Sequence, residues 1–336
     1  MRKVEPSEDD ELGILEDKTE ALPLRSKRTE RALKKQAKKT KKIGEQSQDL
    51  MNLPYELVLQ ILTLLRPSDL FNLQRVSKAY HGFIVQDGPW IAKSIMNWRY
   101  ACLKKCFRLP VLMEKVDPSI QAFIQSPERL DLHIVHQKPY KHVQAPDPAE
   151  ICTCLTCLLR WLSLCLIVDF SHWQKNLDMG EPIPMIRRGK NPEWNRNLIA
   201  SNAAIVRKAL HSPLWYARLL EAHLSSTVRS ISRHAANKGN KRHRFRMSRR
   251  EMESGADLFL ERSGPPSFDF PFHRDNYYML EAYLPNRGWN AEHEKWMYVP
   301  ANQHNLDIDY IASRGRIRRK RAAEETERQP EEGQRT

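Results

Sequence analysis

The chain of 336 residues predicts a mainly α-helical fold with charged ends that lie outside the folded part. Three observations indicate this class. A segment near residue 50 carries closely spaced helix signals, later segments show apolar residues at a spacing near 3.6, and only one aromatic part suggests a few strands. Hydrophobic residues make up 40% of the chain, which is enough for at least one sizeable core.

The net charge of +14 is concentrated in three segments. Residues 25–42 hold ten Lys and Arg, residues 238–250 hold seven, and residues 314–321 hold six. Outside these runs 32 basic residues stand against 40 acidic ones. The folded part is therefore net acidic, and the basicity that is typical of nucleic-acid binders belongs to the segments alone.

Both ends are predicted to be disordered. Residues 1–48 change from acidic to basic with hardly an aromatic residue, and residues 313–336 form a polar tail of the same kind. Such segments cannot bury enough apolar surface to offset the entropy lost on ordering. No apolar run follows the first charges, so no secretory signal is expected. Six cysteines without such a signal favour a reducing compartment, the nucleus and/or the cytoplasm.

The first predicted helix, within residues 49–95, is unusually apolar. It begins near Pro54, which suits a first helical turn, and it ends before Pro67 because the residue before a proline is displaced from the α region. Seven of the nine positions 57–65 are Leu, Val or Ile. A helix that is apolar nearly all round must be covered nearly all round, and so small a unit usually cannot do this alone. Either the rest of the chain or a partner protein must cover it.

Two further short helices are expected in the same segment. Ser68 is predicted to cap the second helix, and Ser77 is predicted to cap the third. The third helix is expected to end near Gly88 and Pro89. The result is a three-helix motif of about 40 residues.

The motif resembles the F-box in the order and spacing of its residues, over roughly residues 50–95. The resemblance is carried by Leu-Pro-x-Glu-Leu at 53–57, Asp-Leu at 69–70 and Val-Ser-Lys at 76–78. It implies a three-helix motif that docks on a Skp-family adaptor and, through it, on the cullin and RING subunits of an SCF-type ubiquitin ligase. The positions that match the family's docking pattern are Leu53, Pro54, Leu57, Ile61, Leu65, Leu70, Val76 and Trp90.

The remainder is predicted to consist of a connector, residues 96–149, and a mostly helical region that binds a protein client, residues 150–312. This region resembles the carboxyl-terminal part of fungal-type F-box proteins. No repeat period is present between residues 96 and 310. The expected elements are helices within 150–178 and 197–233, a basic loop at about 235–252, and strands at 277–284 and 295–299.

Residues 154–170 are apolar enough to raise the question of a membrane span. The run contains Arg160 and Asp169, and a spanning helix needs about 20 predominantly apolar residues. We therefore expect a buried helix and no membrane partner.

A group of cysteines has a spacing that could suit metal ligands, with histidines upstream: Cys152, Cys154, Cys157, His133, His136 and His142. Structural zinc is typically held by four thiolate or imidazole ligands in two spaced pairs, and only one such group is evident. The preferred interpretation is buried thiols that act as small hydrophobes, so we expect no metal and no cofactor. Zinc with a histidine as fourth ligand is the alternative.

The sequence predicts no enzyme and no catalytic residue. His273-Arg274-Asp275 is similar to part of a kinase catalytic loop, but that loop needs an Asn five residues after the Asp, and residue 280 is Leu. Cys106 and Cys165 lack any local catalytic signature.

Two functional hypotheses follow. The first is a substrate-receptor subunit of an SCF-type ubiquitin ligase with an unknown protein client. The second is an F-box protein that acts outside the ligase, or a nuclear protein that contacts nucleic acid through its basic arms. Such binding would be non-specific, through one face of a helix over residues 31–42 that carries Arg31, Lys34, Lys35, Lys38, Lys41 and Lys42.

Overall fold

The computed structural model describes residues 30–36, 38, 50–127, 129, 142–187, 189–239, 245–262 and 270–328. The chain divides into two compact units, Met1–Leu53 and Pro54–Thr336. In the first unit residues 30–36 are helical and exposed, and the 3-10 turn η1 spans Leu50–Asn52. This helix lies within the arm that the sequence predicts to be disordered, and it is the conformation that would place Arg31, Lys34 and Lys35 on one face. Lys41 and Lys42 lie outside the described residues.

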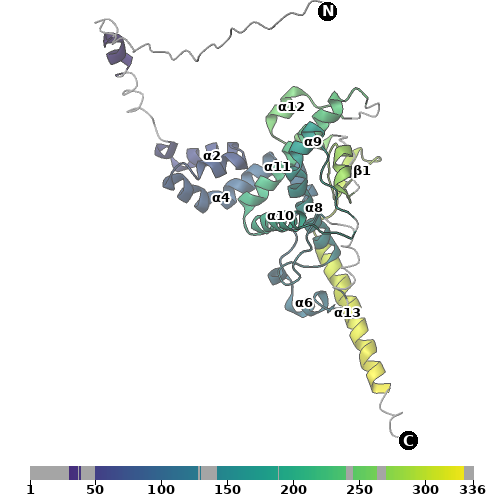
Figure 1. Cartoon of the computed structure of the whole chain (residues 1–336). Helices are drawn as coiled ribbons and strands as arrows, with labels where there is room; N and C mark the ends of the chain where they lie inside the picture. Colours follow the sequence, from purple (N-terminus) through teal and green to yellow (C-terminus); the bar gives the residue numbers. More distant parts are fainter. Residues whose placement is uncertain are drawn as a thin grey trace, which may run out of the picture. The chain divides into compact units, whose positions relative to one another are not determined.

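The described part of the second unit is mainly helical, as the sequence predicts (Figure 1). The predicted helices within 150–178 and 197–233 are confirmed as α8 with α9 and as α10 with α11. The helices are α2 (Tyr55–Leu64), α3 (Pro67–Leu73), α4 (Lys78–Trp98), α5 (Ala101–Cys106), α6 (Pro118–Ile124), α8 (Leu155–His172), α9 (Gln174–Met179), α10 (Glu193–His211), α11 (Pro213–Ala236), α12 (Arg249–Ser254) and α13 (Gln303–Arg328), with the 3-10 turns η2 (Met113–Lys115), η3 (Leu258–Glu261) and η4 (Arg274–Met279).

Helix α8 forms the centre of the second unit. It lies against α10 and α11, and these two helices also contact each other. Among the described residues it is the one helix long and apolar enough to cross a membrane, but 72% of it is buried inside the protein. The Arg160 guanidinium donates to the carbonyl of Leu109, so its charged group is satisfied within the fold. These contacts make α8 a core helix, as the sequence predicts.

A buried charged network fixes the carboxyl-terminal segment to α8. Arg274 forms two hydrogen bonds with the Asp169 carboxylate, at 2.9 and 2.8 Å, and a third with the side chain of Asn195 at 2.9 Å. The Tyr277 hydroxyl donates to the same carboxylate at 2.7 Å. Burial, reinforced by the charge of Asp169, raises the pKa of Tyr277 well above its ordinary value. Arg274, which belongs to the kinase-like tripeptide, therefore has a structural role.

The boundaries of α3 and α4 differ from the sequence-based expectations. Helix α3 begins at Pro67 with Arg66 as its N-cap, and Ser68 instead bonds Glu221 of α11. Ser77 caps α4 as predicted, because its side chain accepts from the amide of residue 80. The expected end of this helix near Pro89 is wrong, since α4 continues to Trp98.

The continuation of α4 through Pro89 has a packing cause. A proline inside a helix costs about 3 kcal/mol or more. Beyond it, α4 buries Ile91, Ala92, Ile95 and Met96, whose spacing of one, three and one residues places them on one face. Burying a side chain of this kind contributes roughly 1.5–3 kcal/mol, so their sum exceeds the local penalty.

The only sheet in the described part of the chain is an antiparallel hairpin of β1 (Arg287–Asn290) and β2 (Lys295–Tyr298). The predicted strand at 295–299 is confirmed as β2. The predicted strand at 277–284 is wrong, because its first residues belong to η4. Tyr277 and Tyr283 are both buried, and this burial explains their apolar pattern without strand pairing.

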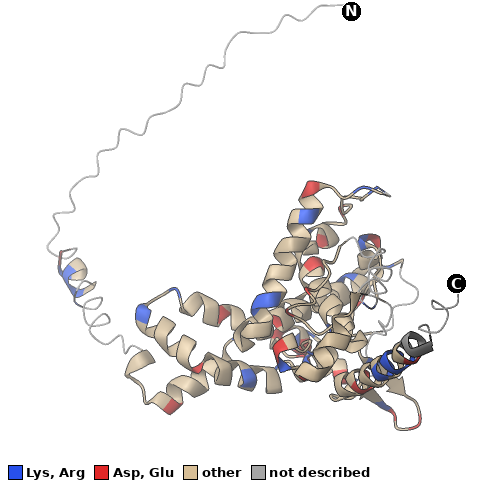
Figure 2. Cartoon of the chain, turned by 90° about the horizontal axis from the view of Figure 1, so that it is seen from below, with Lys and Arg blue, Asp and Glu red and all other residues tan. Residues whose placement is uncertain are grey.

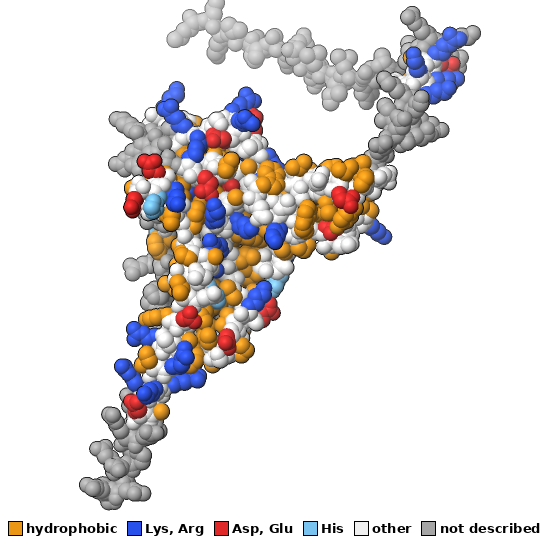
Figure 3. All heavy atoms as spheres, turned by 180° about the vertical axis from the view of Figure 1, so that it is seen from behind, with side chains coloured by type: hydrophobic (Ala, Val, Ile, Leu, Met, Phe, Trp, Pro, Cys, Tyr) orange, Lys and Arg blue, Asp and Glu red, His pale blue; other side chains and the backbone are white. Residues whose placement is uncertain are grey.

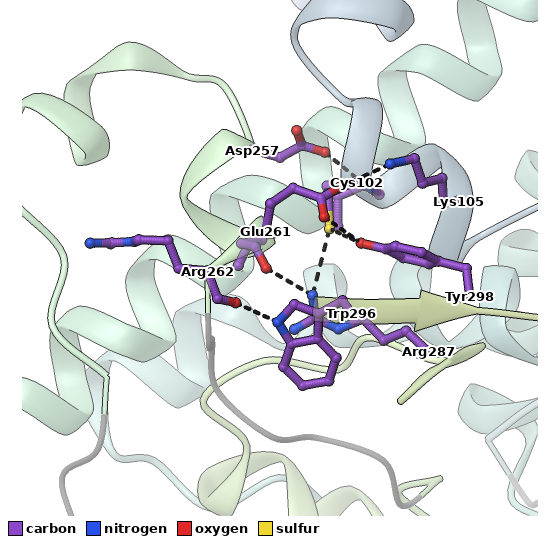
Figure 4. Close-up of polar contacts among 10 residues, drawn as sticks. Cys102, Lys105, Asp257, Glu261, Arg262, Arg287, Trp296 and Tyr298 are labelled. Carbon is purple, nitrogen blue, oxygen red and sulfur yellow. Dashed lines mark hydrogen bonds and ion pairs between the residues drawn. The ribbon is translucent and has the colours of Figure 1, made fainter. Parts of the chain in front are cut away.

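A polar network attaches the hairpin to α5 and η3 (Figure 4). Arg287 donates to the carbonyl of Leu260 at 2.8 Å and approaches the Cys102 sulfur at 3.7 Å. The Tyr298 hydroxyl lies 3.3 Å from the same sulfur and donates to Glu261 at 3.1 Å. Cys102 is thus enclosed by side chains that hold the hairpin in place.

Helix α13 extends beyond the predicted boundary of the folded region at residue 312. Its first turns bury Ile308, Ile311 and Ala312, and it lies against α6 and α8. The helix then continues to Arg328, so residues 313–328 of the predicted tail are helical. The buried turns anchor the helix, and helix propagation adds one backbone hydrogen bond for each further residue.

Candidate protein-interaction site

The three F-box helices share a small core. Val58 and Leu62 of α2, Leu70 of α3 and Ile84 of α4 are at most 2% exposed. Leu70, a predicted docking residue, therefore packs inside the protein and does not belong to the exposed surface. It is buried because α3 lies between α4 and α11.

Helix α11 supports this motif from one side. Ser68 donates to the Glu221 carboxylate through its amide at 2.8 Å and through its hydroxyl at 2.6 Å. The rings of Phe71 and Trp215 have centroids 4.8 Å apart. Part of the apolar surface of the motif is thus covered by the same chain, as one of the two sequence-based alternatives proposed.

A second apolar face of the motif stays exposed in the described part of the chain. Leu57 is 45% exposed, Trp90 53%, Leu64 64% and Val76 70%. Figure 3 shows hydrophobic side chains gathered over these helices, in the arm on the right of the view. Leu57, Ile61 and Leu64 follow one another at helical spacings of four and three residues, so they share one face of α2. This face, with Val76 and Trp90, is named the α2 patch below.

The remaining predicted docking residues have intermediate positions. Pro54 is exposed, whereas Ile61 and Leu65 are half-buried. Leu53 is half-buried and belongs to the first unit. Sequence analysis did not include Tyr55 or Leu64, which are 48% and 64% exposed.

Contacts between α2 and α4 hold the helix that carries the α2 patch in place. The Tyr55 hydroxyl donates to Asp87 of α4 at 2.7 Å, and this hydrogen bond is the main reason that the pKa of Tyr55 is raised. The ring of Tyr55 lies 5.4 Å from that of Phe83. These contacts fix α2 against α4 while its outer apolar side chains stay exposed. Exposed apolar side chains gathered on one small motif are typical of a protein interaction site.

Helical packing and an uncovered apolar face define this segment as a protein-interaction module. Residues 50–94 match the F-box-like family model, which confirms the resemblance found in the sequence. Searches of curated proteins and of solved structures found no match to the chain. The protein carries an F-box-like domain, and such a domain implies an adaptor that binds other proteins.

A cluster of possible metal ligands lies away from the α2 patch, at the start of α8 and of α13. Its members are Cys152, Cys154, Cys157 and His304, whose ligand atoms all lie within 4.8 Å of one another. None of the three histidines proposed from the sequence takes part among the described residues. His142 is buried and stacks on Phe270 with ring centroids 6.1 Å apart, and His133 and His136 lie outside the described residues.

Basic residues follow one another along α13, where the ribbon is coloured largely blue (Figure 2). A pocket of about 900 Å³ lies between α6 and α13. It is lined by Phe123 and by arginines that include Arg129, Arg314 and Arg319. The Arg319 guanidinium lies 4.2 Å from the centre of the Phe123 ring, a cation–π distance.

Proposed function

We propose that this protein is the substrate-receptor subunit of an SCF-type E3 ubiquitin ligase. The α2 patch docks on a Skp-family adaptor, which brings the cullin and RING subunits. The observation that carries the proposal is an F-box-like domain whose apolar side chains remain exposed after the rest of the chain has covered its other side. A few apolar anchors of this kind can supply most of the affinity of a helix for a groove.

The carboxyl-terminal region, residues 150–312, presents the client in this proposal. Its core is built on α8, α10 and α11, and α11 also supports the F-box helices. A rigid connection between the two parts would hold the client at a fixed position relative to the ligase. The chain itself catalyses no reaction in this scheme, and it acts in the nucleus and/or the cytoplasm.

The direct test is binding of the full chain to the adaptor when charge is placed on the α2 patch. In the variant Leu57→Asp with Leu64→Asp, each carboxylate would be buried unpaired against the adaptor, at a cost of several kcal/mol. Each 1.4 kcal/mol is a tenfold change in affinity. We expect the dissociation constant, measured by calorimetry, to rise by at least about 100-fold.

The matched control is Leu258→Asp, because Leu258 is 74% exposed and lies in η3, outside the F-box-like domain. It should bind the adaptor as the unmodified protein does. Circular dichroism should show the same helix content for all three proteins, since the substituted side chains are exposed. Adaptor binding that survives the double substitution, or that fails equally in the control, would reject the α2 patch as the docking site.

A second candidate function, binding to nucleic acid, is supported by the exposed basic residues of α13. Arg316, Arg318 and Lys320 are all exposed on that helix. If the protein works on nucleic acid outside the ligase, the full chain should bind DNA or RNA without sequence preference, and the affinity should fall steeply with salt. Replacing Arg316 and Lys320 with Gln should weaken that binding and leave the adaptor complex intact. Recovery of adaptor without cullin would favour action outside the ligase.

A further inference from the structure

Three cysteines and one histidine meet where α13 crosses the start of α8. Cys154 is the N-cap of α8, and Cys157 lies in its first turn. His304 lies in the first turn of α13. Its Nδ1 atom is 3.4 Å from the sulfur of Cys154 and 3.3 Å from that of Cys157. One imidazole nitrogen therefore faces two thiol sulfurs at once.

These distances are close to those that a tetrahedral metal requires. With zinc–sulfur bonds of about 2.3 Å and zinc–nitrogen bonds of about 2.0–2.1 Å, neighbouring ligand atoms lie roughly 3.5–3.8 Å apart. The four ligand atoms here are all within 4.8 Å of one another. An ion at their centre would need only small movements of the side chains.

Each of the three sulfurs accepts a backbone hydrogen bond. The amide of Cys154 donates to the sulfur of Cys152, the amide of Cys157 donates to that of Cys154, and the amide of Val111 donates to that of Cys157, each at 3.4 Å. Hydrogen bonds from amides favour thiolates over thiols, because a bond to a charged acceptor is stronger. Such outer contacts are the ones that orient and tune metal ligands.

The surroundings also suit the charge of a loaded site. Three thiolates, one neutral imidazole and Zn²⁺ carry a net charge of −1. The Arg129 guanidinium donates to the carbonyl of Thr153 at 3.1 Å, between two of the cysteines. All three cysteines are fully buried in a small apolar cluster that includes Ile308 and Ile311 of α13. A buried anion with a guanidinium beside it is better compensated than an isolated one.

We propose that Cys152, Cys154, Cys157 and His304 bind one zinc ion as a closed structural site. Three thiolates and an imidazole form a set that zinc binds at four-coordinate tetrahedral geometry. All four positions are filled by protein, so the ion joins the start of α13 to the start of α8 and activates no water. Asp307 strengthens the same junction, because its carboxylate accepts from the amide of Thr156 at 2.8 Å.

The test is the zinc content of the full chain, purified under reducing conditions and analysed by inductively coupled plasma mass spectrometry. We expect one equivalent of zinc, which is lost in His304→Ala and in Cys157→Ser. Two variants are matched controls and should keep the ion. Cys165→Ser changes a buried thiol outside the cluster, and His293→Ala changes an exposed histidine.

A second measurement uses the unmodified chain, so the outcome does not depend on the folding of variants. After removal of zinc, Co²⁺ should bind in one equivalent and give the strong visible absorption of a tetrahedral thiolate complex. Chelation should also speed proteolytic cleavage within α13. A chain that holds neither zinc nor cobalt in the reduced state, or one whose zinc survives both ligand substitutions, would overturn the proposal.

The zinc proposal is independent of the proposed adaptor complex, because the cluster shares no residue with α2, α3 or α4. His304→Ala should lose zinc and still bind the adaptor. Leu57→Asp with Leu64→Asp should lose the adaptor and keep zinc. Zinc content and adaptor binding are therefore independent measurements, and an error in one proposal would leave the result for the other unchanged.

Discussion

Helices α2 and α8 are both strongly apolar, yet their surroundings differ. Helix α8 has thirteen of its 18 residues buried, including the charged Arg160 and Asp169. Helix α2 buries Val58, Leu62 and Thr63 and leaves leucines exposed. Because the chain covers α8 with α10 and α11, its apolar character serves the core. The outer face of α2 stays exposed in the described part of the chain, so its apolar side chains are available to a partner.

The two helices also differ in the hydrogen bonding of their polar groups. Along α8, the carboxylate of Asp169 is compensated by Arg274 and Tyr277, so that the buried charge has partners on several sides. At the exposed end of α2, the Tyr55 hydroxyl donates to the Asp87 carboxylate in contact with solvent. A carboxylate needs several protein hydrogen-bond partners only where water is excluded, because an unpaired buried charge is costly. The number of protein partners bonded to its charged side chains therefore distinguishes a core helix from an interface helix, even when the two helices are equally hydrophobic.

The largest expected effect on stability is at Asp169. Replacing it with Ala leaves the Arg274 guanidinium buried without its charged partner, which should reduce the free energy of unfolding by about 3–5 kcal/mol. Urea unfolding monitored by circular dichroism measures the loss. Asp178→Ala is the control, since its ion pair with Arg229 is partly exposed and should contribute about 0–1 kcal/mol. Equal losses in the two variants would contradict a special role for the buried network.

The next largest expected effect is a pH dependence of stability that comes from His223 of α11, whose ring lies 4.6 Å from that of Phe107. Burial lowers the pKa of His223 to about 4, against the opposing hydrogen bond that its Nε2 forms with the Tyr283 carbonyl at 2.7 Å. Between pH 6.5 and 4 the unfolded chain binds a proton at this residue and the folded chain does not. The contribution of His223 to stability is therefore complete above pH 6.5 and is lost as the pH falls, by up to about 3 kcal/mol at pH 4.

The variant His223→Gln isolates this contribution, because Gln can donate to the same carbonyl but does not titrate. Its free energy of unfolding should fall less steeply than that of the unmodified protein between pH 6.5 and 4. Burial raises the pKa of Asp257 to about 7, which acts in the opposite direction in both proteins and cancels in the comparison. Identical slopes would show that the face of α11 at His223 is accessible to water.

The sequence predicted those features that depend on neighbouring residues. The 3.6-residue spacing located α8, α10 and α11, and the motif beginning at Leu53 and Pro54 located the F-box-like segment. It did not predict that α4 passes through Pro89, because the buried face that outweighs the proline is formed only in the packed structure. Leu70 matched the docking pattern although it lies in the core. Docking positions and core positions both require an apolar side chain, so the sequence could not separate the two roles.

The cysteine cluster also could not be predicted completely from local sequence, because one of its members is distant along the chain. Three of the four ligands could be recognised from their spacing within residues 152–157. The fourth, His304, lies 150 residues after Cys154, and nothing in the local sequence distinguishes it from the other histidines. The preferred interpretation was buried thiols because a local pattern with three ligands is incomplete. The contact of α13 with α8 brings the fourth side chain of the proposed zinc site to the three cysteines.

The smallest effect on stability is expected for Leu64→Ala, and its comparison with Leu164→Ala tests the difference between the two helices directly. Leu164 of α8 is fully buried, whereas Leu64 of α2 is 64% exposed. Leu164→Ala removes buried methyl groups and leaves a cavity, so it should cost about 2–5 kcal/mol in urea unfolding. Leu64→Ala is the same chemical change at an exposed position, where substitutions are usually within about 0.5 kcal/mol. If α2 is an interface helix, the exposed leucine should matter only in the complex, where Leu64→Ala weakens adaptor binding while the free protein stays as stable as before. A large loss of stability from Leu64→Ala in the free protein would mean that this face is covered within the chain, and that α2 is a core helix like α8.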